Sequence, residues 1–286
     1  MELFLSQLIN GISNSATMFI GAIGLVIIFG IMNVVNMAHG EFIMLGAYTT
    51  VTLTAMNLPF PVVMLCSFII VGLIGAFIEK VLIKKLYGKK AETLLVTFAL
   101  NYILQQLVRM AYGPEDQNME IPIKGRITAG KITVPYYNLF LIAMAVVILL
   151  VTLFIMYKTT FGMQLRSVTQ NRQMAQCLGI NTAKIDAATF AYGCGLAGLA
   201  GVLVSPIMSV NPGMGVSYVL DSFLIVVMGG LNSIIGTFGG AFVIGESVTL
   251  MAGYMSETAA KLSVFLVIII LIRFKPEGLF SSKERR

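Results

Sequence analysis

Long apolar runs separated by short polar segments make up nearly the whole chain. Between positions 3 and 78, His39 and Glu41 are the only basic or acidic side chains. A run of about 20 apolar residues is long enough to cross the hydrocarbon core of a bilayer as a helix. Lipid offers no partner to backbone N–H and C=O groups, so such runs must satisfy them internally, as helices do. The pattern therefore predicts an all-α polytopic membrane protein.

The runs divide into eight or nine predicted crossings, some of them broken or re-entrant. We place them at residues 8–32, 36–56, 60–77, 93–112, 139–156, 187–208, 218–235, 238–254 and 260–273. The number depends on 36–56, which begins with polar residues and either crosses fully or re-enters on one side. No run is left for a soluble domain, so residues 1–286 are expected to form a single transmembrane domain.

Composition agrees with this class and indicates the orientation. Hydrophobic residues make up 57% of the chain and charged residues 11%, against about 25% charged in soluble domains. Lysines cluster in 80–90, and the tail 275–286 is also basic. Short loops rich in Lys and Arg stay in the cytoplasm, so both segments are predicted to be cytoplasmic. The net charge of +6 is thus explained by topology and not by nucleic-acid binding.

This orientation leaves the side of the N-terminus open. If the first three runs all cross, the N-terminus lies outside. If 36–56 re-enters, the N-terminus lies inside.

A polar group interrupts the first apolar block at Asn36, His39 and Glu41. An ionisable residue in the middle of a membrane helix costs about 2.5–3.5 kcal/mol on insertion scales, so it is usually paired, near an interface or beside water. Gly40 allows the helix to break there, and a broken helix frees backbone groups to face a cavity. The group either lines a translocation path or gate, or caps a helix that starts at the membrane surface.

Two acidic residues occupy comparable places in the second half of the chain. Asp221 follows the segment 205–215, whose prolines and glycines rule out a continuous helix. We interpret it as a carboxylate near the outer interface at a helix start, where it complements the helix dipole. The alternative is that Asp221 belongs to the substrate path. Glu246 lies in the middle of a run and is a candidate for the path or for a contact between subunits.

Small residues predict close helix packing in the same half. Gly193, Ala197 and Gly201 repeat at intervals of four, and Gly236 and Gly240 form a GxxxG pair. Such residues let membrane helices approach closely. The alternative is that small residues are simply common in membrane helices.

The longest polar segment within the apolar sequence is 157–186. It carries Lys158, Arg166, Arg172 and Lys184 against Asp186 alone. Its apolar and polar positions alternate in a helical pattern, Gly179 can end a helix, and Asn181 or Thr182 can cap the next. A simple connector would need only a few residues. We therefore expect a cytoplasmic docking surface that couples the membrane part to a partner.

Signatures of catalysis are absent from the sequence. It contains no GxxxxGK[ST] phosphate loop, no HExxH and no GxSxG, and it has one histidine. We therefore expect neither an enzyme nor a metal site, and no cofactor in this chain. If transport uses ATP, another chain must hydrolyse it.

Four motifs resemble one known family. They are NMAHGEFIMLGAY near the N-terminus, RSVTQNRQMAQCLGINTAKIDAATFAYGCGLAGLAGVL in the middle, VVMGGLNSIIGTFGGA, and RFKPEGLF near the end. In this order they resemble permeases of the branched-chain amino acid and urea group of ABC importers. TQNRQMAQCLGI, AETLLVTFALNYILQQLVR and SYVLDSF look more like the urea-type permeases. We therefore expect urea or a short amide as substrate, with branched-chain amino acids as the alternative.

The resemblance implies a set of partners and a location. The chain would reside in the bacterial cytoplasmic membrane and pair with a second permease or a copy of itself. Two ATPase subunits would use ATP and Mg²⁺ below it, and an extracytoplasmic binding protein would deliver the substrate. The region expected to dock into the ATPase comprises Arg166, Gln170, Asn171, Arg172, Met174, Ala175, Leu178, Gly179 and Ile180.

Two other classes of transporter compete with this interpretation. A secondary transporter would need an ion or proton relay, for which His39, Glu41, Asp221 and Glu246 could be used. A passive channel would have no need of a long docking loop. Dependence of transport on ATP separates both from an ABC permease.

Overall fold

The computed structural model describes residues 2–129, 132–231, 233–275 and 278–279. In its first half the elements are α1 (Glu2–Leu25), a π-helical turn η1 (Val26–Ile31), α2 (His39–Ala55), α3 (Phe60–Val81), a 3-10 turn η2 (Ile83–Leu86) and α4 (Lys90–Tyr112). A hairpin of β1 (Arg126–Ala129) and β2 (Ile132–Pro135) follows. The rest are α5 (Tyr136–Lys158), α6 (Thr160–Gln170), α7 (Arg172–Cys177), α8 (Thr182–Val204), α9 (Met214–Gly229), α10 (Ile234–Ala252) and α11 (Glu257–Phe274).

The fold class is an all-α, multi-pass membrane protein, as predicted. Within the described part of the chain, six helices are long and apolar enough to cross a membrane. They are α1 with η1, α3, α4, α5, α8 and α10. Helix α9 is apolar but shorter, α2 has 17 residues, and α11 carries the charges of Glu257, Lys261 and Arg273. The count of eight to nine crossings stays a prediction.

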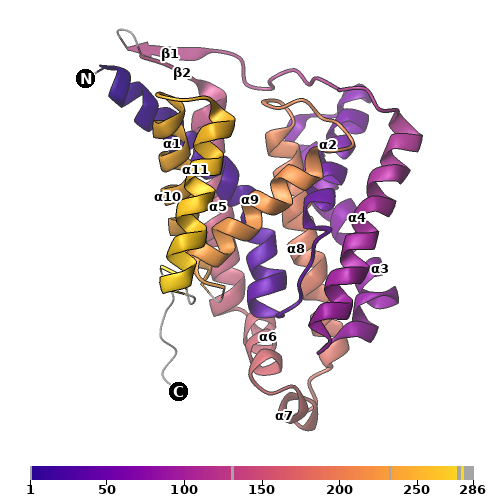
Figure 1. Cartoon of the computed structure of the whole chain (residues 1–286). Helices are drawn as coiled ribbons and strands as arrows, with labels where there is room; N and C mark the ends of the chain where they lie inside the picture. The colour runs from indigo at the N-terminus through magenta and orange to yellow at the C-terminus, as the bar shows by residue number, and fades with distance from the viewer. Residues whose placement is uncertain (1, 130–131, 232, 276–277, 280–286) are drawn as a thin grey trace.

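The long helices run between two ends of the molecule (Figure 1). Helices α6 and α7 lie at one end, and the β1–β2 hairpin lies at the other. The lysine-rich turn η2 is at the α7 end, because the Arg172 guanidinium lies over the ring of Tyr87. The two basic segments 80–90 and 157–186 therefore share one end. This is the end that the positive-inside rule assigns to the cytoplasm.

The chain between α1 and α2 leaves regular helix inside the bundle. Helix α1 passes into the π-turn η1, and Asn33 then adopts a left-handed backbone with φ 57°. The extended segment that follows rises to the start of α2 within the bundle (Figure 1). At the far end of α2, Thr52 Oγ1 lies 2.7 Å from the hydroxyl of Tyr112 at the end of α4. Residues 33–56 thus run from the α7 end to the hairpin end, and α1 begins at the hairpin end.

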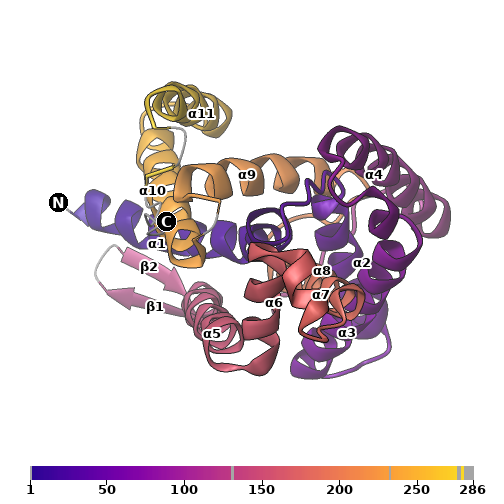
Figure 2. The ribbon, with the colours of Figure 1, turned by 90° about the horizontal axis from the view of Figure 1, so that it is seen from below.

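Helix α8 occupies the centre of the packing. It contacts α1, α2 and α3, and in the view from the α7 end it lies behind α7 (Figure 2). The backbones approach closely at glycines: a Cβ on Gly193 would meet the α1 backbone at Gly24, and one on Gly201 would meet the Ile43 carbonyl of α2. Gly195 faces Phe68 of α3 in the same way. Small residues on α8 let three helices pack against it at once.

Two predicted segments differ from the structure. The crossing predicted at 218–235 is wrong at its end, because Gly230 has φ 101° and stops α9. Ser233 then caps α10, its Oγ accepting a hydrogen bond from Gly236 N (2.9 Å). The segment 113–135, between the crossings predicted at 93–112 and 139–156, contains the antiparallel pair β1–β2, which the hydrophobic pattern did not indicate.

We expect Gly201→Leu to destabilise the bundle and Ala188→Leu on the exposed side of α8 to leave it unchanged. A side chain at position 201 would collide with the backbone of α2, while Ala188 is exposed. Overpacking a tight contact costs about 1–3 kcal/mol. Thermal unfolding of the purified protein in detergent measures the difference. Equal melting temperatures for the two variants would contradict the central packing of α8.

Candidate functional site

A polar pocket opens between α1, the segment 205–213, α9 and α11. Its volume is about 450 Å³, and the first turns of α9 and α11 place it toward the hairpin end of the molecule. The polar side chains that line it are Asn14, Thr17, Ser209, Asn211, Ser217, Tyr218, Asp221, Ser222, Glu257 and Lys261. We call this cavity the outer pocket. It combines a volume suited to a small solute with a polar and charged lining.

The charges of the outer pocket centre on Lys261. Its Nζ lies 4.0 Å from Asp221 Oδ2 and 3.7 Å from Glu257 Oε1. The Asp221 side chain is 17% exposed, so its charge needs a partner. Asp221 stands two turns into α9, which begins at Met214, and the interpretation of Asp221 as a helix-start carboxylate is therefore wrong. One ammonium between two carboxylates leaves the pocket with an excess of negative charge.

The polar group of the first block is buried directly behind this pocket. Asn36, His39 and Glu41 are all 0% exposed. His39 Nε2–H donates to the carbonyl oxygen of Gly21 (2.9 Å), and Gly21 also lines the outer pocket. The N-cap of α2 makes no side-chain hydrogen bond. The structure therefore does not match a cap at the membrane surface.

Several polar atoms of this group have no partner among the described residues. They are Asn36 Nδ2, His39 Nδ1 and both carboxylate oxygens of Glu41. The Glu41 carboxyl lies against Gly215 at the start of α9. Buried polar atoms are normally hydrogen-bonded in proteins, so this group marks a polar place between α2 and α9. A role in the path stays a prediction.

Glu246 lies in a different contact, between α10 and α1. Its carboxylate packs on Gly11, and its Oε1 is buried without a partner in the described part of the chain. Polar contacts run along the same seam, where Asn14 Nδ2 donates to Thr249 Oγ1 (3.2 Å). The position of Glu246 favours a role in the contact between α1 and α10. The GxxxG pair packs elsewhere, since Gly236 and Gly240 both face Gly229 of α9.

The predicted docking segment forms two short helices, α6 and α7. Helix α6 ends at Gln170, and Asn171 turns the chain by capping α7, with Oδ1 accepting from Met174 N (2.9 Å). Gly179 has φ 81° and ends this hairpin, and Asn181 caps α8. We call residues 160–180 the coupling hairpin. Asparagine is a preferred residue at helix starts and glycine at helix ends, so each of these boundaries agrees with the local sequence.

The apolar side chains of the coupling hairpin divide between two faces. Leu165, Val168 and Ala175 are buried against the bundle. Met174 and Leu178 are 58% and 73% exposed at the tip of the molecule. Gln170 is exposed as well, and Ile180 is half-buried. Two exposed apolar side chains on a helical tip form a surface that a partner can cover.

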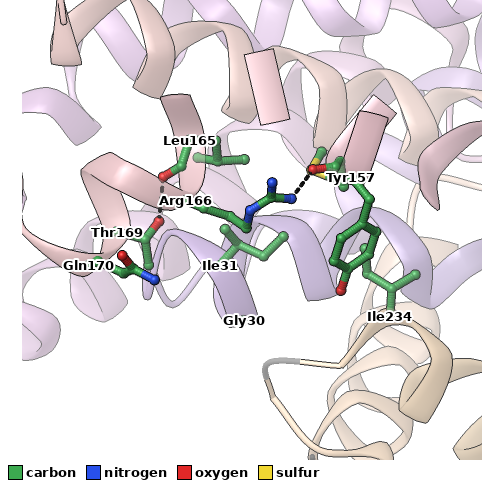
Figure 3. A pocket seen from close by; sticks show the side chains of 9 residues that line it. Gly30, Ile31, Tyr157, Leu165, Arg166, Thr169, Gln170 and Ile234 are labelled. Atoms are coloured by element: carbon green, nitrogen blue, oxygen red, sulfur yellow. Dashed lines mark hydrogen bonds between the residues drawn. The ribbon is translucent and has the colours of Figure 1, made fainter. Parts of the chain in front are cut away.

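Arg166 points toward the end of α5 (Figure 3). Its guanidinium donates to the Met156 carbonyl and lies 5.2 Å from the ring centroid of Tyr157. A cavity of about 370 Å³ adjoins it, between the end of α5, α6, Gly30 and Ile234. Arg166 therefore fastens α6 to α5, and Figure 3 shows it directed toward Tyr157.

Some residues of these sites were missed at the level of sequence. Lys261 lies in the crossing predicted at 260–273 and Glu257 just before it, and neither was predicted to belong to a site. A lysine inside an apolar run needs a counter-charge, and this signal could have paired it with an acid. Tyr87 and Glu79, which contact the Arg172 region through a hydrogen bond and a stacked ring, have no sequence pattern that marks them.

The structure is an apolar multi-pass bundle with a charged outer pocket and a helical hairpin exposed at its cytoplasmic end. These features are typical of a membrane transport subunit. Residues 7–273 match the family model described as branched-chain amino acid transport system / permease component. The chain belongs to this family and is a multi-pass protein of the cytoplasmic membrane. It is a permease subunit of the ABC-importer class and not an enzyme.

Curated relatives cover nearly the whole chain. It is 28% identical to the high-affinity branched-chain amino acid transport system permease protein BraD of Pseudomonas aeruginosa, over 98% of this chain and 97% of the relative. It is 27% identical to the permease protein LivH of Salmonella typhimurium, over 98% and 96%. A probable LivH of Methanocaldococcus jannaschii is 27% identical over 82% and 77%. No significant match to a solved structure was found.

Labelling of the natural cysteine at the hairpin tip tests the orientation. Cys177 is exposed at the end of α7, whereas Cys194 is buried. A membrane-impermeant maleimide should label Cys177 in inside-out vesicles and not in intact cells, and Cys177→Ser should remove the signal. Glu120→Cys, on the opposite end, should react in intact cells. Labelling of Cys177 from the outside would reverse the assigned topology.

Proposed function

We propose that this chain is the permease subunit of an ATP-driven importer of branched-chain amino acids. The match to the family model over residues 7–273 supports this substrate class. The names of BraD and LivH support it as well, since both are permeases of branched-chain amino acid systems. The urea-type specificity expected from local motifs has no support among these relatives.

The observation that carries the substrate class is the charge pattern of the outer pocket. An amino acid at neutral pH has an ammonium and a carboxylate, whereas urea has no charge. Asp221 and Glu257 can receive the ammonium, and Lys261 can receive the carboxylate. Opposite charges attract strongly where water is partly excluded. The apolar side chains of Met18, Met208 and Met214 in the same lining can contact an aliphatic side chain.

The partners follow from the two ends of the molecule. A binding protein outside the membrane would release the amino acid toward the outer pocket. Two ATPase subunits would bind at the cytoplasmic end and use ATP and Mg²⁺. A second permease, either related or identical to this chain, would complete the path between the two ends.

The coupling hairpin is the surface we assign to an ATPase subunit. Met174 and Leu178 present apolar area at its tip, and the flanking side chains are polar or basic. Burial of apolar area contributes about 25 cal/mol per Å². Closure of the ATPases on ATP would then displace the hairpin and the helices joined to it. In this scheme, the buried polar group at the start of α2 becomes accessible when α2 and α9 separate.

Uptake into proteoliposomes tests the proposal. The permease is reconstituted with its ATPases, its second permease and its binding protein. Uptake of labelled leucine, isoleucine or valine should require ATP inside the vesicle and exceed urea uptake at equal concentration. ATP-dependent uptake of urea in preference to leucine would restore the urea hypothesis. Uptake that continues without ATP would favour a secondary transporter.

Asp221→Asn provides the matched substitution in the same assay. The variant keeps the size of the side chain and removes the charge. A hydrogen bond to a charged group contributes about 1.5–3 kcal/mol, which corresponds to roughly tenfold or more in affinity. We expect leucine uptake to fall by about this factor, and Glu115→Gln in the loop after α4 to leave it unchanged. Full uptake by Asp221→Asn would remove Asp221 from the path.

A further inference from the structure

A chain of polar contacts joins the coupling hairpin to two membrane helices. The Arg172 guanidinium, on the first residue of α7, donates to Asp186 Oδ2 on α8. The same guanidinium lies 5.0 Å from the ring centroid of Tyr87, in the turn after α3. The hydroxyl of Tyr87 donates to Glu79 Oε1 in the last turn of α3 (2.9 Å). Four side chains thus connect α7, α8 and α3.

Burial makes these contacts stronger than those of an exposed ion pair. The Asp186 side chain is 6% exposed and that of Arg172 is 41% exposed, while Glu79 is 1% exposed. Surface ion pairs contribute little because water and salt screen them, and charge-assisted hydrogen bonds in shielded places contribute more. Burial also raises the pKa of the Tyr87 hydroxyl, so this group remains a hydrogen-bond donor to Glu79.

A short helix and a turn lie between the Arg172 contacts and the rest of α8. Helix α7 has six residues, and residues 178–181 lead from it to α8 through the left-handed Gly179. A cavity of about 420 Å³ lies beside the network, between Arg172, Asp186, Tyr87 and the segment after η1. The contacts between Arg172, Asp186 and Tyr87 therefore run along a cavity, where the helices are not closely packed. A displacement of α7 is transmitted here by these side chains, together with the buried Ala175 and the hydrogen bond from Gln176 Nε2 to Thr182 Oγ1 (3.1 Å).

The helices that receive this displacement are tightly joined to each other. A Cβ on Gly75 of α3 would meet the side chain of Cys194 on α8, and one on Gly198 of α8 would meet Val71 of α3. Interfaces of this kind transmit motion because they cannot deform gradually. Asp186 and Glu79 thus sit at the cytoplasmic ends of one rigid pair of helices.

We propose that Arg172 is a positioning residue that transmits movement of the coupling hairpin to the α3–α8 pair. It acts through its ion pair with Asp186 and its stacking on Tyr87. Movement of α7 by an ATPase subunit would pull Asp186 and, through Tyr87, Glu79 in the same direction. This inference rests on the proposed function, because it assumes that an ATPase engages the hairpin.

The ratio of leucine transported to ATP hydrolysed tests the inference in the reconstituted complex. Arg172→Gln, Asp186→Asn and the double variant should each assemble with the ATPases and hydrolyse ATP, but the ratio should fall by about tenfold, within the usual range of coupling between sites. The double variant should fall no further than either single one, because both remove the same interaction. Arg172→Asp with Asp186→Arg should recover part of the ratio.

Two further variants separate transmission from simple anchoring. Tyr87→Phe keeps the ring under Arg172 and removes the bond to Glu79, and we expect a fall of about threefold on the same scale. Lys184→Gln removes an exposed charge from the same turn of α8 as Asp186 and should have no effect. Loss of assembly in parallel with loss of transport would assign Arg172 to anchoring and overturn the inference.

The same experiment distinguishes failure of the inference from failure of the proposed function. If wild-type uptake requires ATP and the transport ratio of Arg172→Gln and Asp186→Asn equals that of the wild type, only the inference is overturned. If wild-type uptake proceeds without ATP, the proposed function fails and the inference fails with it.

Discussion

The close packing of α8 against α1, α2 and α3 is the constraint on which the rest of the structure depends. Glycines on α8 bring its backbone against Gly24 of α1 and Ile43 of α2. Such contacts leave no room for gradual adjustment. Helix α8 begins at the coupling hairpin and passes beside the buried polar group at the start of α2. Helix α8 therefore connects the coupling hairpin with the region behind the outer pocket.

The acidic side chains buried in the bundle are of two kinds, those in an ion pair and those without one among the described residues. Lys261 is balanced by Asp221 in the outer pocket, and Arg172 is balanced by Asp186 at the cytoplasmic end. Glu41 and Glu246, by contrast, each have a buried oxygen without a partner among the described residues. Charges within membranes are usually paired and mark functional places. Both acids lie where helices meet, so a change in helix packing would alter their surroundings most.

Much of the fold could be predicted from the sequence, because the length and polarity of each run are set by the bilayer. The caps at Asn171 and Asn181 and the turn at Gly179 could also be anticipated from residue type. The start of α2 inside the bundle, the split of the hairpin and the end of α9 could not, because tertiary packing decides between local alternatives. The pairs Asp221 with Lys261 and Arg172 with Tyr87 join residues far apart in the chain, which no periodicity indicates.

We infer that the nucleotide state of the ATPases reaches the outer pocket through α8. It is tested most directly by the reactivity of Ser217→Cys, an exposed position of the outer pocket, in a chain that lacks its natural cysteines. Maleimide labelling rates are compared in the assembled complex with and without a non-hydrolysable ATP analogue. We expect the analogue to change the labelling rate and Asp186→Asn to remove this change. Equal rates in the two nucleotide states of the wild-type complex would contradict it.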